Sequence, residues 1–200
     1  SVIDSHRTPY QVQRYLSSLP YNREAGGATL LSFRGVIRKN RAHCLEAAIV
    51  AAVVMEYWGY PPLLVSSESQ DFLDHVLFLY KKGDRYGSVA RSRDIGLHGR
   101  KPVFRTVRDL VMSYFEDYFN WDGDRTLRAY SRPLSLARFD RIGWMTAEED
   151  LWPVVEWLAV ARHTPRQPTG GTASGPCRCR AGRRYCRWPG WRCSARRWPM

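Results

Sequence analysis

The longest apolar stretch of the chain covers residues 44–58, which read CLEAAIVAAVVMEYW. Its nonpolar side chains fall on nearly all sides of a helix, and a helix of that kind is buried rather than amphipathic. Gly59 and the Pro61–Pro62 pair follow directly and predict where the helix ends. The stretch contains Glu46 and Glu56 and is too short to cross a bilayer. The pattern therefore predicts a central buried helix and no membrane partner.

After this helix, the polar and apolar positions follow the pattern of strands. Leu63–Ser66 is a short apolar segment, and a polar, acidic loop follows it over residues 67–74. Val76–Tyr80 and Arg85–Arg91 flank the turn sequence KKGD, which indicates a β-hairpin. The pattern leaves the structure type of residues 29–38 open.

Three further segments have apolar residues at helical spacing. Pro9–Leu19 and Val107–Phe119 each place these residues on one face. A third helix is expected to begin near Thr146, because Glu149 stands at the spacing of a capping box. Pro153 inside that segment predicts a kink or a later start. A buried helix, an antiparallel hairpin and further C-terminal helices together argue for an α+β domain.

Charge divides the chain at residue 165. The net charge of +12 at first suggests a nucleic-acid partner. However, residues 166–200 hold nine Arg and no acidic residue, whereas residues 1–165 hold 22 basic and 19 acidic residues. The net charge of +3 on residues 1–165 argues against nucleic acid as the partner of this part. We therefore expect one domain over residues 1–165, followed by a separate tail.

The tail is rich in Arg, Gly, Pro, Cys and Trp and has almost no aliphatic residues. Such a segment cannot form a core, so we expect it to be disordered. A zinc module is disfavoured because Cys177, Cys179, Cys186 and Cys193 lack the usual C-x-x-C pairs. A nucleic-acid-binding tail would use the Arg residues and the interleaved Trp residues. We favour a third interpretation, in which GC-rich DNA is read out of frame.

Cys44 is the only cysteine among residues 1–165. A single thiol predicts no disulfide within this domain and favours a reducing compartment. Residues 1–8 are too polar for a signal peptide, so we expect a cytoplasmic location. The sequence contains no HExxH, P-loop or GxGxxG motif. We therefore expect neither a metal nor a cofactor.

Cys44 stands at the start of the predicted buried helix, and His75 stands 31 residues later at the start of an apolar run. A helix N-terminus and a nearby imidazolium both lower the pKa of a thiol. The unpaired N–H groups of a first helical turn can hold a developing oxyanion. A histidine can accept and return the proton. This order favours a cysteine nucleophile, and the alternative is a packed structural cysteine with a histidine at a strand edge.

The motifs AHCLEAA, GYPPLLV, DHVLFLY, YGSVARSRD and GLHGRKPVFRT together resemble a bacterial branch of the transglutaminase-like superfamily. The segment LPYNREAGGATLLSFRGVIR resembles the lead-in of the same proteins, and the likeness covers about residues 9–165. The resemblance implies a papain-like α+β fold, with a central buried helix packed on an antiparallel sheet. It also implies that Cys44 is the nucleophile and His75 the base. The implied reaction is thioester chemistry on a peptide or protein amide.

The third member of the site departs from the superfamily pattern. There, an Asp follows the His on the next strand, often within Trp-x-x-x-Asp. In this chain Tyr86 stands near the Trp position, and the same spacing leads to Ala90. We predict that Asp94 takes the role, because a carboxylate orients the ring and stabilises the imidazolium. Ser92 is the alternative.

The remaining polar candidates have plainer interpretations. We expect Asp74 to be a loop carboxylate, His43 a solvated residue before the helix, and His98 an ordinary loop histidine. Arg34, Arg91 and Arg93 are expected to lie on a solvated face.

Three functions remain open at this stage. The first is a cysteine peptidase, amidase or acyltransferase. The second is an inactive transglutaminase-like module that binds a peptide or protein, and the third is a nucleic-acid binder that acts through its tail. The sequence determines neither the substrate, nor whether water or an amine takes the acyl group, nor the oligomeric state.

Overall fold

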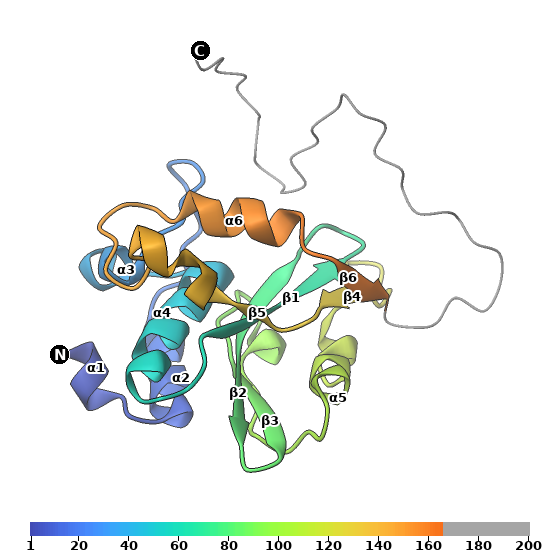
Figure 1. The fold of residues 1–200 in the computed structure, drawn as a ribbon. Helices are drawn as coiled ribbons and strands as arrows, with labels where there is room; N and C mark the ends of the chain where they lie inside the picture. Colours follow the sequence, from blue (N-terminus) through green and yellow to red (C-terminus); the bar gives the residue numbers. More distant parts are fainter. Residues whose placement is uncertain (166–200) are drawn as a thin grey trace.

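An antiparallel sheet of six strands forms the centre of the structure, a computed structural model that describes residues 1–165 (Figure 1). The strand order is β3-β2-β1-β4-β6, and β5 pairs with β1. The predicted tail, residues 166–200, lies outside the described residues. The strands are β1 (Leu63–Ser69), β2 (His75–Lys82), β3 (Arg85–Val89), β4 (Leu127–Ser131), β5 (Leu134–Ser135) and β6 (His163–Pro165).

Helices cover both faces of this sheet (Figure 1), which makes the fold α+β as predicted. The α-helices are α1 (Val2–Ser5), α2 (Pro9–Ser18), α3 (Phe33–Lys39), α4 (Cys44–Tyr57), α5 (Val107–Met112) and α6 (Trp152–Ala159). Three 3-10 segments complete the described elements, namely η1 (Ile95–Leu97), η2 (Phe115–Asp117) and η3 (Leu136–Ile142).

Strand β2 is buried on both faces. Its successive side chains point to opposite sides of the sheet, and a hydrophobic cluster covers each side. Val76 and Phe78 belong to the larger hydrophobic cluster, which also contains the buried residues of α4. Leu77 and Leu79 belong to a second cluster, which they share with Leu110 of α5. The first six residues of β2 are therefore buried without alternation. This explains why its sequence is a continuous apolar run.

Helix α4 is the buried helix that the sequence predicts. Every residue from Cys44 to Met55 is buried. The helix contacts β2 on one side, and it also contacts α2 and α3. Because neighbours surround this part of the helix, its apolar side chains are not exposed to water and it needs no polar face. Within residues 1–165, no helix combines the length and the apolar character needed to span a membrane.

The structure corrects one element prediction and decides two points that the sequence left open. The third helix begins at Trp152, which is the later start that Pro153 predicted, and Pro153 lies in its first turn, where proline is tolerated. The segment predicted as one helix over Val107–Phe119 is α-helical only to Met112, and a 3-10 turn follows. Part of the open segment 29–38 forms α3, whose N-cap residue Ser32 accepts the Gly35 N–H.

Candidate active site

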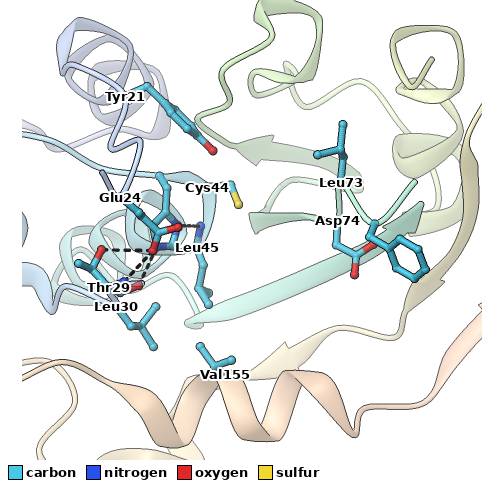
Figure 2. A pocket seen from close by; sticks show the side chains of 11 residues that line it. Tyr21, Glu24, Thr29, Leu30, Cys44, Leu45, Leu73, Asp74 and Val155 are labelled. Atoms are coloured by element: carbon cyan, nitrogen blue, oxygen red, sulfur yellow. Dashed lines mark hydrogen bonds and ion pairs between the residues drawn. The ribbon is translucent and has the colours of Figure 1, made fainter. Parts of the chain in front are cut away.

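Cys44 is the first residue of α4, so its sulfur lies at the positive end of the helix dipole. The residue is 6% exposed, and Figure 2 shows its sulfur pointing into a pocket. The pocket has a volume of about 190 Å³. Its walls come from the segment before α3, from the start of α4, from the loop before β2 and from α6. Residues that line it include Tyr21, Glu24, Leu30, Leu73, Asp74 and Val155.

His75 is the first residue of β2 and is 3% exposed. Its Nε2 lies 2.9 Å from the carbonyl oxygen of Leu97. Because a carbonyl can only accept, Nε2 carries the proton. The other ring nitrogen, Nδ1, is then the one available to exchange a proton with Cys44. The ring of Tyr114 meets the imidazole edge-on, with centroids 6.4 Å apart, and restricts its rotation.

The pKa of Cys44 is lowered to about 5. Burial acts in the opposite direction, because it disfavours the charged form. Hydrogen bonds and positive charge from His43 and His75 outweigh the burial effect. A thiol with such a pKa is thiolate at neutral pH, and the thiolate is the nucleophilic form.

His43 is the N-cap of α4 and is buried, so the prediction of a solvated residue is wrong. Its Nδ1 accepts the Leu45 N–H at 3.2 Å, and its Nε2 lies 3.1 Å from the Thr29 carbonyl oxygen. Burial lowers its pKa, but hydrogen bonding to Cys44, the thiolate charge and two nearby carboxylates raise it to about 9. Both nitrogens already bind backbone groups, so protonation of Nδ1 would exchange the cap bond for a bond to Cys44. His75 loses no hydrogen bond when its Nδ1 takes the proton, which makes it the better base.

Glu46 is fully buried and holds the start of α4 in place by hydrogen bonds. Its carboxylate accepts the N–H groups of His43 and Leu31, each at 2.9 Å. It also accepts the Thr29 hydroxyl at 2.9 Å and the Asn22 amide at 3.0 and 3.2 Å. These bonds fasten the segment before α3 to the helix that carries the thiol. The sequence analysis missed this role, although Glu46 stands at the capping-box position relative to His43.

The structure does not bring Asp94 to His75 by a hydrogen bond. Its carboxylate pairs with Arg93 at 3.2 Å, and its side chain is 54% exposed. Asp94 is the residue before η1, and the turn of η1 directs the carbonyl of Leu97 to the His75 ring instead. The alternative, Ser92, is buried, but its hydroxyl accepts the Asp94 N–H at 3.1 Å. A main-chain oxygen thus stands where we predicted a carboxylate.

The other polar candidates have structural partners. Asp74 lines the pocket and accepts the Ser69 N–H at 2.9 Å. His98 lies 3.0 Å from Arg91, so it is more constrained than an ordinary loop histidine. Arg34 pairs with a glutamate of the loop before α6.

Arg100 holds the loop that carries the Leu97 carbonyl. Its guanidinium donates to the carbonyl oxygens of Gly96 and His98 at 2.7 and 3.1 Å. It also forms an ion pair with Asp117 at 2.7 Å and covers the ring of Tyr114 at 4.1 Å. A side chain at Gly96 would collide with Asp117, since a Cβ there would lie 2.4 Å from its Oδ1. Arg100 is therefore a positioning residue for His75.

We expect Arg100→Ala to leave the His75 ring less firmly oriented, while the residues that line the pocket stay unchanged. The Leu97 carbonyl would lose its support, so the midpoint of Cys44 alkylation against pH should rise by about one unit. Stability should fall by about 1–3 kcal/mol, because the part-buried carbonyl groups of Gly96 and His98 lose their donor. Alkylation rates across pH and urea unfolding measure the two effects.

Arg85→Ala is the matched control, because within residues 1–165 Arg85 forms an ion pair only with its exposed neighbour Asp84. It should leave the alkylation midpoint unchanged. An Arg100→Ala profile that overlays the Arg85→Ala profile would contradict the positioning role.

Within residues 1–165 there is no cluster of three or more His, Cys, Asp or Glu side chains that could hold a metal ion. No protein-family model matches the chain, and no curated protein sequence matches it either. The chemistry of the site therefore rests on its own geometry. The structure brings the predicted residues Cys44 and His75 together, and the sequence analysis did not foresee the Leu97 carbonyl, which has no side-chain signature.

Proposed function

We propose that this protein is a papain-like and transglutaminase-like cysteine enzyme that acts on a peptide or protein amide through a thioester. The observation that carries the proposal is the Cys44 thiol, which opens a buried helix, lines a pocket and is held as thiolate beside two imidazoles. The resemblance of the sequence motifs to the transglutaminase-like superfamily supports the same chemistry.

The first half of the reaction forms the thioester. The Cys44 thiolate attacks the amide carbon, and the carbonyl electron pair moves onto oxygen. The first turn of α4 stabilises this oxyanion through its N–H groups and its dipole. Collapse of the oxyanion breaks the carbon–nitrogen bond, and the proton on His75 goes to the leaving amine.

The second half releases the acyl group. Water or an amine attacks the thioester carbon while His75 takes the proton from the attacking atom. The carbon–sulfur bond breaks, and the Cys44 thiolate returns. Water gives hydrolysis, and an amine gives acyl transfer. The same residues serve both outcomes.

The pocket size supports a polymeric substrate. A volume of about 190 Å³ is below the range of about 300–1,000 Å³ that encloses a whole small ligand. Such a pocket suits one side chain, and the rest of the substrate would lie outside it. Apolar residues such as Leu30, Leu73 and Val155 suit the aliphatic part of that side chain.

The proposal is tested by incubating the full chain with a peptide mixture and a labelled primary amine. Mass spectrometry would detect new peptide termini if water is the acceptor, and amine-labelled peptides if an amine is. Cys44→Ser should reduce both products to background, because removal of a nucleophile costs on the order of 10⁶ in rate. Products of equal yield from the Cys44→Ser variant would overturn the proposal.

A further inference from the structure

Tyr21 approaches the pocket from a segment that is tied to the start of α4. Its backbone forms a parallel bridge with Ala42, two residues before Cys44. The Asn22 N–H donates to the Ala42 carbonyl at 3.1 Å, and the Ala42 N–H donates to the Pro20 carbonyl at 3.3 Å. The position of Tyr21 is thus fixed relative to the thiol by backbone bonds.

The Tyr21 ring is also held from its side. The Arg91 guanidinium lies 5.7 Å from the ring centroid and donates to the Leu19 carbonyl at 3.0 Å. Figure 2 shows the hydroxyl pointing toward the pocket beside the sulfur of Cys44. Burial, the thiolate charge and Glu24 raise the pKa of Tyr21 well above its usual value. The hydroxyl therefore keeps its proton and can donate it in a hydrogen bond.

A second donor is needed at the site. An oxyanion is best stabilised by more than one preorganised donor. When His43 is neutral, the Leu45 N–H of the first turn of α4 donates to its Nδ1, which leaves one N–H group fewer for the oxyanion. Among the other lining residues, Glu24 and Asp74 carry acceptor groups, the Thr29 hydroxyl donates to Glu46, and His43 directs its hydrogen bond to Cys44. Tyr21 supplies the donor that these groups do not.

We propose that the Tyr21 hydroxyl donates a hydrogen bond to the oxyanion that forms when Cys44 attacks a carbonyl group. The inference rests on the proposed function and adds a catalytic residue to it. The hydroxyl and the N–H groups of α4 would approach the oxygen from two segments, which the bridge at Ala42 keeps in register.

Two reactions of Cys44 separate this role from a general effect on the thiol. Iodoacetamide reacts by displacement at carbon, and no oxyanion forms. With 4-nitrophenyl acetate, the sulfur bonds to the carbonyl carbon and the electron pair moves to oxygen. Collapse of this oxyanion then breaks the ester bond and releases 4-nitrophenolate. The full chain is used with Cys177, Cys179, Cys186 and Cys193 replaced by Ser, so that Cys44 is the only thiol.

Tyr21→Phe removes the hydroxyl and keeps the ring. We expect acylation by 4-nitrophenyl acetate to slow about 100- to 1,000-fold, in line with the loss of one oxyanion donor. Alkylation by iodoacetamide near pH 8 should change by less than about twofold, because the thiol is ionised in both proteins. Tyr10→Phe is the matched control, since Tyr10 is exposed on α2, and it should change neither rate.

Two results would overturn the assignment of Tyr21. Equal acylation rates for Tyr21→Phe and Tyr10→Phe would show that the hydroxyl does not act on the oxyanion. An equal loss in acylation and alkylation would show that it acts on the thiolate instead. Failure of the unsubstituted protein in both reactions would refute the proposed function itself, and the assignment with it.

Discussion

The rate of alkylation of Cys44 by iodoacetamide should rise through about pH 5 and be close to its plateau at pH 6. Only the thiolate reacts, so the rate rises with pH through the pKa of the thiol. Because the fold lowers that pKa, the rise moves to lower pH. Relative to its own plateau, a thiol of pKa 5 reaches roughly 90% at pH 6, whereas a free thiol of pKa 8.5 reaches about 0.3%.

The thiolate of Cys44 and the imidazolium of His43 also coexist only up to an upper pH limit. The pKa of His43 is raised to about 9, so its imidazolium is lost as the pH rises through that value. The state with a thiolate beside an imidazolium therefore extends from about pH 5 to about pH 9. Measured rates over this range, with the four tail cysteines replaced by Ser, give the profile directly.

Two substitutions determine which imidazole lowers the pKa of Cys44. His75→Ala should raise the midpoint, because its hydrogen bond and charge no longer favour the thiolate. His43→Asn removes the second imidazole and keeps a side chain that is a good N-cap. A shift in His43→Asn alone would transfer the role of base to His43. A midpoint near pH 8.5 in the unsubstituted protein would indicate a packed structural cysteine.

Glu46→Ala should destabilise the protein by about 3–5 kcal/mol or prevent folding, as does removal of one partner from a buried charged network. The substitution leaves the N–H groups of His43 and Leu31 without their acceptor. It also frees the Asn22 amide and the Thr29 hydroxyl. Each unsatisfied buried group costs about 1–3 kcal/mol, and urea unfolding measures the sum.

Glu56→Ala is the matched control on the same helix. Oε2 of Glu56 is buried without a hydrogen-bond partner among the described residues, so its removal should cost little. Glu46→Gln should fall between the two, because it keeps one acceptor oxygen and introduces donors that face other donors. Equal losses for Glu46→Ala and Glu56→Ala would show that the Glu46 network does not stabilise the domain.

The sequence predicted the elements whose signal is local. Helix α4 was predictable because burial on all sides leaves an unbroken apolar run, and the hairpin of β2 and β3 was predictable from its turn. The start of α6 was left open between Thr146 and a later residue, since the capping signal at Thr146 and Glu149 competed with Pro153, which lies in the first turn. Strands β4 and β6 depend on distant pairing and give weak local patterns.

The candidate site likewise contains residues that the sequence could predict and residues that it could not. Cys44 and His75 could be predicted because each opens an element and carries a reactive side chain. Buried Glu46 and Arg100 could not, because their roles depend on groups brought together by the fold. Asp94 was predicted as a nearby carboxylate that could orient the ring, and the hydrogen bond observed at His75 is made by a backbone atom.

The bond between His75 and the Leu97 carbonyl has a consequence for how the site responds to mutation and to acid. A peptide oxygen belongs to the backbone, so replacement of the Leu97 side chain leaves it in place, and an alanine scan would pass over it. A peptide oxygen also does not titrate, whereas a carboxylate is protonated in acid. The acid limb of an activity profile would therefore carry no contribution from the group that accepts the His75 hydrogen bond.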